Sequence, residues 1–382
     1  MSDELFIYDD PRFLSGGADY HLNANYDVAP PETDGCTILR SPQVAEVSGC
    51  DVAAALRHRG QAIHGGKSGY HSRPPYNVFL KSGDYPSAGV ELETIAKACT
   101  SDFVRRLQEN LRSNWFHAER DGSLDTAHSG EYGFEWITEP LPPRVYRDPR
   151  TWIGLQNLLV PWVESFTRSE CGLHVHVGLE QFESSANLTF RGLPDGASRR
   201  RLGKYLSAFV YYSMLNPSFV DRVTLRKTSQ YCLTSAASGF CGGFRPGMTS
   251  AEVVDMVLQK VMKAYGDGQW SSYASQLADL EARSMPGTEL SPIKGTELSE
   301  FTGHSVEVNA SHPFTIEFRR GKGTLQGISI HRMVELMTLV VRFAWKMARE
   351  PFMTIERDDV YKYIAANTKS AALRGMAEKE IG

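Results

Sequence analysis

Several segments of this chain alternate apolar residues with ionisable ones, the pattern of β-strands that have one apolar face. Side chains two residues apart on a strand share a face. In GVELE this places Glu91 and Glu93 together, and in CGLHVHVG it places His174 and His176 together, with the apolar residues between them on the other side. A chain built from such strands is expected to fold around a sheet with one packed face and one face of ionisable groups.

Two further segments follow the same rule. GFEWITEP places Glu135 and Ile137 on one face, with Glu139 following on it, and TIEFR places Glu317 and Arg319 on one face. Carboxylates that converge repel one another unless cations neutralise them. Mg²⁺ and Mn²⁺ bind carboxylate oxygens, Mn²⁺ also accepts imidazole, and arginine binds phosphate in bidentate fashion. The pattern therefore predicts a sheet face that binds metal ions and phosphate.

Each segment taken alone has a plainer interpretation. The pair Glu91 and Glu93 is also typical of a solvated strand, and one histidine of HVH can be a hydrogen-bonded structural residue. Glu317 and Arg319 can form a structural ion pair. The set favours a site because the same side-of-strand logic recurs in every segment.

Hydrophobic periodicity predicts helices between and after these strands. A turn is expected at residues 119–125, and strands at 304–310 and 313–321. Thr249 stands three residues before Glu252, the spacing of a capping box. The expected helices cover residues 95–115, 148–166 with a kink at Pro161, 199–215, 249–265 and 326–348.

Composition limits the partners and the compartment. The chain has 382 residues, a net charge of −4 and a sequence pI of about 6.3, so it lacks the basic balance of a nucleic-acid-binding protein. The longest apolar stretch is interrupted by charges, which predicts no membrane span. The six cysteines form no CxxC pair and the first residues form no apolar leader, which favours a reducing cytoplasm.

The distribution of proline and glycine predicts two parts. Residues 1–87 are expected to form an N-terminal appendage of short helices and loops, with no function assigned. Residues 88–382 are expected to form the main domain, with a helical insertion around residues 180–300. The glycine-rich segment 321–327 lacks the spacing of a Walker loop and is expected to be either a flexible flap or a plain turn.

The motifs GVELE, DGSL, GFEWITEPL, CGLHVHVG and VEVN followed by FTIEFRRGKGTLQ resemble, in this order, the amidoligase family. That family belongs to the carboxylate–amine ligases of the glutamine synthetase and glutamate–cysteine ligase type. The resemblance covers about residues 88–349. It implies an α+β fold in which helices flank a curved, mainly antiparallel sheet of the glutamine synthetase-like catalytic type, with ATP and several Mg²⁺ or Mn²⁺ ions on the concave face.

The resemblance also implies roles for individual residues. Asp121 or Glu139 is implied as the base that takes a proton from the amine, and Asp121 and Ser123 match a motif at the mouth of the site. Asn309 matches a position that shapes the site. The implied metal ligands are Glu91, Glu93, Glu135, His174 and Glu317. The implied contacts to nucleotide phosphate are His176, the catalytic Arg319 and, by a weaker match, Arg222 or Arg226.

The implied reaction is ATP-dependent formation of an amide or peptide bond through an acyl phosphate. The substrates would be a carboxylate and an amine, such as an amino acid, a peptide or a protein side chain, and the number of subunits stays open. Two alternatives also stay open. One is a metal-dependent hydrolase of the HxH type, which would need more His and Asp ligands and repeated βα units. The other is a non-catalytic binding protein that has kept the fold.

Overall fold

A computed structural model of the chain describes residues 85–96, 116–120, 124, 132–138, 141–160, 163–165, 171–178, 196–226, 243–265, 307–309 and 315–381. Contacts divide the chain into two units. The first comprises Met1–Tyr76, Ala88–Val175 and Gly321–Val334, and the second comprises Asn77–Ser87, His176–Arg320 and Glu335–Gly382. The division passes within two strands and one helix, β5, β8 and α12, whose bounds follow.

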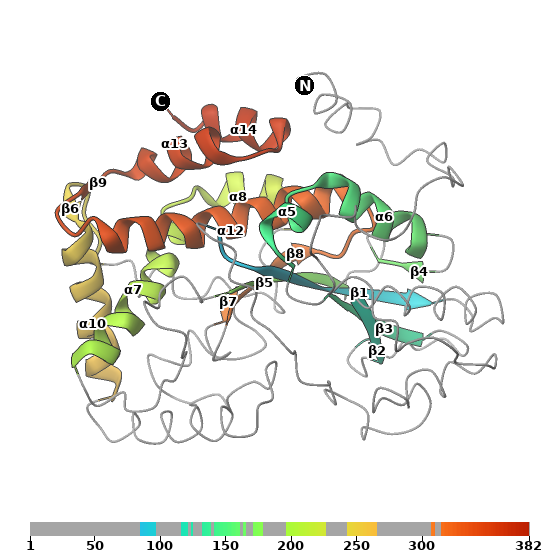
Figure 1. Cartoon of the computed structure of the whole chain (residues 1–382), viewed down its shortest axis with the longest axis horizontal. Helices are drawn as coiled ribbons and strands as arrows, with labels where there is room; N and C mark the ends of the chain where they lie inside the picture. The colour runs from blue at the N-terminus through green and yellow to red at the C-terminus, as the bar shows by residue number, and fades with distance from the viewer. Residues whose placement is uncertain are drawn as a thin grey trace. The chain divides into compact units, whose positions relative to one another are not determined.

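The described strands form a seven-stranded sheet in the order β2-β3-β1-β5-β8-β7, with β4 beside β1 (Figure 1). The pairs β1–β3, β1–β4, β2–β3 and β7–β8 are antiparallel. This confirms the expected α+β class with a mainly antiparallel sheet flanked by helices. The strands are β1 Ala88–Ala96, β2 Phe116–Arg120, β3 Tyr132–Thr138, β4 Val163–Glu164, β5 Gly172–Gly178, β7 Val308–Asn309 and β8 Thr315–Lys322.

In the first unit, β1 and β3 form the centre of the apolar packing. Leu92 and Trp136 are Cα partners across the two strands, and both are buried. The indole Nε1 of Trp136 donates to the hydroxyl of Thr94 at 2.8 Å, so the polar atom of this large side chain is satisfied inside the core. This pairing fixes the register, and a slip of one residue would turn every side chain of β1 to the other face.

Two helices of the first unit follow β3, α5 at Pro143–Tyr146 and α6 at Pro149–Leu159. The side chain of Asp148 caps α6 by accepting from the amide of Arg150 at 2.9 Å. The expected helix 148–166 was wrong beyond Leu159, because Pro161 has no N–H to continue the helical hydrogen bonds. Val163 and Glu164 instead form β4 against β1.

The expected turn at 119–125 was also wrong at its start, because Glu119 and Arg120 belong to β2. The backbones of Glu119 and Arg120 pair with β3 opposite Glu135 and Phe134. The run ERDG is rich in turn-forming residues, but the pairing partner on β3 extends the strand to Arg120.

The helices of the second unit confirm most of the periodicity. The long orange-red helix of Figure 1, α12, begins in the first unit and continues into the second. Its observed bounds match the expected helix 326–348 to within one residue. The helices are α7 Gly196–Ser213, α8 Pro217–Thr224, α10 Ser250–Tyr265, α12 Gly327–Arg349, α13 Arg357–Asn367 and α14 Ala371–Glu378.

The capping box of α10 is present. The hydroxyl of Thr249 accepts from the amide of Glu252 at 3.3 Å, and the Glu252 carboxylate accepts from the amide of Thr249 at 2.7 Å. These bonds lower the pKa of Glu252, because the backbone amide and the hydroxyl of Thr249 both donate to its charged form. Residues Met248–Thr249 also form β6, which pairs with β9, Thr354–Ile355.

Three helices, α7, α8 and α10, lie in the part of the chain expected to be a helical insertion, and the domain boundaries themselves stay predictions. Residues 1–84 lie outside the described residues, and the expected appendage lies there almost entirely. Among the described helices, none combines the length and the apolar character that a membrane span requires.

Candidate functional site

The ionisable face of β1 and β3 is buried. Glu91 and Glu93 are each 8% exposed and Glu135 is 5% exposed, so the interpretation of β1 as a solvated strand was wrong. Glu93 and Glu135 are Cα partners across the two strands, and side chains of directly opposed residues lie on the same face. The carboxylates therefore gather on one side of the sheet, as the alternation predicts. Three buried carboxylates in one place are stable only beside positive charge or hydrogen-bond donors.

His174, on β5, lies between two of these carboxylates and is itself buried. Its Nδ1 is 3.4 Å from Oε2 of Glu91, and its Nε2 is 3.6 Å from Oε1 of Glu93. The other oxygen of Glu93 accepts from the amide of Gly172. The imidazole therefore lies close to both carboxylates, and an imidazole nitrogen with a free lone pair is a common metal ligand.

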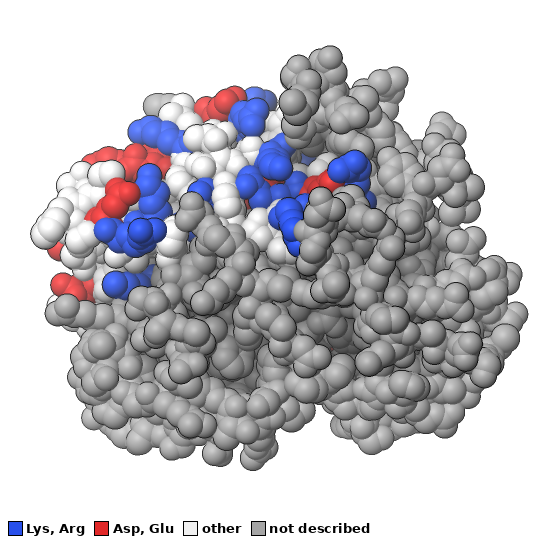
Figure 2. All heavy atoms as spheres, in the orientation of Figure 1, with Lys and Arg blue, Asp and Glu red and all other residues white. Residues whose placement is uncertain are grey.

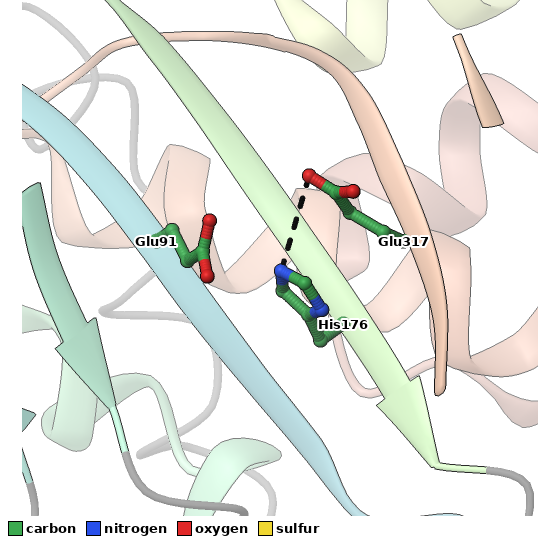
Figure 3. A group of neighbouring side chains, drawn as sticks. All are labelled: Glu91, His176 and Glu317. Carbon is green, nitrogen blue, oxygen red and sulfur yellow. Dashed lines mark ion pairs between the residues drawn. The ribbon is translucent and has the colours of Figure 1, made fainter. Parts of the chain in front are cut away.

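His176, two residues further along β5, faces a second cluster, in the second unit. Its Nε2 is 3.9 Å from Oε1 of Glu317, and its Nδ1 is 3.4 Å from the hydroxyl of Thr315. Glu317 is only 1% exposed, and Figure 3 shows the His176 ring turned toward its carboxylate. Arg319 Nη1 donates to Oε1 of Glu317 at 2.5 Å, and Asn309 Nδ2 donates to Oε2 at 2.9 Å.

Glu91, His176 and Glu317, the side chains drawn in Figure 3, can together hold a metal ion. Each offers one ligand atom, and the three atoms lie within 4.8 Å of one another. Two carboxylate oxygens and one imidazole nitrogen fit Mn²⁺ in particular, and the carboxylates fit Mg²⁺. His176, expected to be a phosphate contact, thus also lies where it could bind a metal ion.

No family model, curated protein or solved structure matches this chain. The resemblance to the amidoligases therefore rests on the sequence motifs, and the roles that it implies stay predictions.

The remaining residues expected in the site differ in where they lie. Asp121, Ser123 and Glu139 fall outside the described residues. Asn309 and Arg319 both contact Glu317, as described above. Arg222 lies on α8, where its guanidinium pairs with Glu380 at 2.5 Å and its side chain is 47% exposed. Its expected contact to a nucleotide stays a prediction.

The pairing of Arg222 is one of several at the surface. Figure 2 shows Lys and Arg side chains beside Asp and Glu side chains on the described part of one face. Arg150 pairs with Asp148 at 2.7 Å, and Lys362 with Asp359 at 3.5 Å. Exposed ion pairs of this kind contribute about 0–1 kcal/mol each, so they say little about function.

A buried network of ion pairs and hydrogen bonds beside β8 was not predicted from the sequence. Arg320 Nη1 donates to Glu307 and its Nη2 to Asp221, both at 2.6 Å. The hydroxyl of Tyr212 also donates to Glu307 at 2.6 Å. Burial works to lower the pKa of Arg320, but the electrostatic pull of Tyr212 and Glu307 outweighs it and the pKa is raised. The doubled arginine in TIEFRR was the available signal, because adjacent strand residues point to opposite faces.

The glycine-rich segment after β8 is packed rather than free. Gly321 is part of the strand, and a Cβ there would be 2.3 Å from the backbone oxygen of Leu173. The amide of Gly323 donates to the carbonyl of Cys171 at 3.2 Å. The expectation of a flap was therefore wrong here, because these glycines allow close approach of two backbones.

Proposed function

We propose that this chain is an ATP-dependent carboxylate–amine ligase with a sheet of the glutamine synthetase-like type. The observation that carries the proposal is the surroundings of β5. This strand brings two histidines to one face, and buried carboxylates flank each of them: Glu91 and Glu93 beside His174, and Glu317 beside His176.

The burial of these groups supports a functional role. Removing a carboxylate from water costs several kcal/mol, and an apolar residue of similar volume is as stable or more stable in a sheet core. A sheet selected only for stability would therefore not place Glu91, Glu93, Glu135 and Glu317 in one buried face. Clusters of buried ionisable groups are typical of catalytic and metal-binding sites.

The residues would divide the work between metal ions and phosphate. We assign the metal ions to Glu91, Glu93, Glu135 and Glu317 with His174 and His176. Bound Mg²⁺ or Mn²⁺ would supply positive charge against the phosphate oxygens of ATP. Arg319 would bind a phosphate oxygen on the same face, because a guanidinium matches the geometry of phosphate. The γ-phosphoryl group of ATP would be transferred to the carboxylate with release of ADP, and the amine would then attack the acyl phosphate, lose a proton to a base and displace inorganic phosphate.

The antiparallel pairing of the described strands argues against the hydrolase alternative. A barrel that binds zinc through HxH is built from parallel strands, each followed by a helix. In the part of the chain that the structure describes, β1 pairs with β3, β2 with β3 and β7 with β8, all antiparallel. We therefore favour the ligase, and a non-catalytic binding protein is the alternative that the experiment below must separate.

The test is ATP turnover. The purified chain is incubated with ATP and Mg²⁺ and with pools of amino acids or peptides, and ADP and phosphate are measured. We expect ADP release that requires both a carboxylate and an amine, and that is lost in Glu91→Gln and Glu317→Gln. The matched control is Glu378→Gln, an exposed carboxylate at the end of α14 that should leave turnover unchanged.

Two outcomes contradict the proposal. Stoichiometric zinc without nucleotide binding would indicate the hydrolase. A folded protein that binds neither a divalent ion nor ATP would indicate a binding protein that has kept the fold.

A further inference from the structure

We propose that Arg319 is an internal cation that is exchanged for a metal ion: it pairs with Glu317 in the metal-free protein, and metal binding releases its guanidinium to bind phosphate. This inference rests on the proposed function and adds an order of binding to it, because the metal ion would prepare the site for the phosphate.

The two oxygens of Glu317 are held in different ways. Oε2 accepts from the amide nitrogen Nδ2 of Asn309 at 2.9 Å, and Asn309 is fully buried on the neighbouring strand. Oε1 accepts from Nη1 of Arg319 at 2.5 Å. A neutral amide on one oxygen can remain in place when a metal ion binds the other oxygen. The guanidinium therefore lies against one of the two oxygens through which Glu317 could bind a metal ion.

The same oxygen, Oε1, is the one that faces His176. The Nε2 of His176 is 3.9 Å away from it, while Nδ1 lies 3.4 Å from the hydroxyl of Thr315. A second partner at Nδ1 orients the ring and leaves Nε2 to the metal ion, as is usual for metal-binding histidines. Asn309 and Thr315 therefore hold the ligands in place, and Arg319 is the cation with which the metal ion competes.

A metal ion and a guanidinium against one carboxylate oxygen repel each other, and this repulsion is stronger in a site with little water. The side chain of Arg319 is 12% exposed, against 1% for Glu317, so it lies nearer to solvent than its partner. Once displaced, a guanidinium that remains partly buried requires another anion, and phosphate accepts its hydrogen bonds in bidentate fashion.

The neighbouring arginine shows what a fixed pair looks like. Arg320 is 4% exposed at its side chain and is held by two carboxylates, Glu307 and Asp221, both at 2.6 Å. Arg319 instead pairs with Glu317, which is a proposed metal ligand. The two adjacent arginines thus divide into a structural one and an exchangeable one.

Exchange makes the binding of metal ion and phosphate interdependent. If the metal ion frees Arg319 for phosphate, phosphate must tighten the binding of the metal ion by the same factor. Removal of the guanidinium should break this link while leaving the carboxylate and imidazole ligands in place.

The experiment is a titration of Mn²⁺ followed by the electron paramagnetic resonance signal of the free ion, with and without inorganic phosphate. In the unmodified chain we expect phosphate to tighten Mn²⁺ binding. In Arg319→Gln we expect Mn²⁺ alone to bind about fivefold more tightly or better, and phosphate to have no further effect. The control is Arg357→Gln, an exposed arginine at the start of α13, which should behave like the unmodified chain.

The outcomes separate this inference from the proposed function. If the unmodified chain binds Mn²⁺ and Glu317→Gln abolishes binding, but Arg319→Gln binds Mn²⁺ no more tightly, the exchange is refuted and the ligase proposal stands. If the unmodified chain binds no Mn²⁺, the proposed function fails. Should Arg319→Gln not fold, Arg319→Lys keeps the competing charge without the bidentate donors. It should bind Mn²⁺ alone as the unmodified chain does, because the competing charge is still present, and Mn²⁺ binding about fivefold tighter in this variant would overturn the inference.

Discussion

A substitution in the buried network beside β8 should lower the stability of the protein without changing metal binding. Glu307 is 2% exposed and accepts hydrogen bonds from Arg320 and Tyr212, both at 2.6 Å. Glu307→Gln keeps the shape of the side chain but removes the negative charge beside a buried guanidinium. We expect the free energy of unfolding to fall, with metal binding unchanged.

The size of the loss follows from the partners that remain. Breaking a buried ion pair by removing one partner costs about 3–5 kcal/mol, and one charge-assisted hydrogen bond contributes about 1.5–3 kcal/mol. Arg320 keeps Asp221, whose side chain is 29% exposed, so the charge is not left alone. We therefore expect Glu307→Gln to cost about 2–3 kcal/mol, below the full value for a broken pair. Asp221→Asn should cost about 1 kcal/mol or less, because the pair is partly solvated.

The assay is unfolding in urea followed by circular dichroism. It is applied to the single variants Glu307→Gln and Asp221→Asn and to the double variant Glu307→Gln with Arg320→Met. The double variant should recover part of the loss, because it removes the buried charge that the single variant leaves poorly paired. A smaller loss in Glu307→Gln than in Asp221→Asn would refute the reasoning. So would a double variant that is less stable than Glu307→Gln alone.

Three further changes test the fold. Gly321→Ala should lower the free energy of unfolding by about 1–3 kcal/mol through overlap with Leu173, and Gly375→Ala, with nothing within 4 Å, should not; equal effects in urea would contradict the packing. Thr249→Ala should cost about 1 kcal/mol by removing the cap of α10, and unchanged thermal unfolding would disprove the cap. Burial raises the pKa of Tyr361, so stability present below about pH 10 is lost as the pH rises through the folded pKa. Tyr361→Phe should show a shallower alkaline loss, and a steeper one speaks against this sign.

The sequence predicts which side chains share a strand face better than it predicts whether that face is buried. His174 and His176 share a face because strand geometry dictates it, and the same rule places Glu317 and Arg319 together. That Glu91 and Glu93 are buried could not be read from GVELE, because the groups that contact them, Gly172 and His174, lie on β5, 79 and 83 residues further along the chain. Sheet order is a tertiary property, and alternation is the same on a buried face and on a solvated one.

The ends of the elements and the second face of β8 were less predictable. Helix α6 ends at Leu159 because Pro161 interrupts its hydrogen bonds, yet the apolar residues beyond the proline preserve a helical period. The periodicity therefore suggested a longer helix. The partners of Arg320 come from α8 and from the chain before β7, and no local spacing brings Asp221 and Glu307 together.

The central claim is that the buried carboxylates and histidines bind divalent ions, and it is tested most directly by equilibrium binding of Mn²⁺ to the intact chain. The comparison sets Glu317→Gln, on β8, against Glu307→Gln, just before β7. Both carboxylates are buried, and among the contacts described Glu317 faces His176 whereas Glu307 pairs with Arg320. We predict that the unmodified chain and Glu307→Gln bind Mn²⁺ and that Glu317→Gln does not. Absence of binding in the unmodified chain, or equal binding in both variants, would contradict the account.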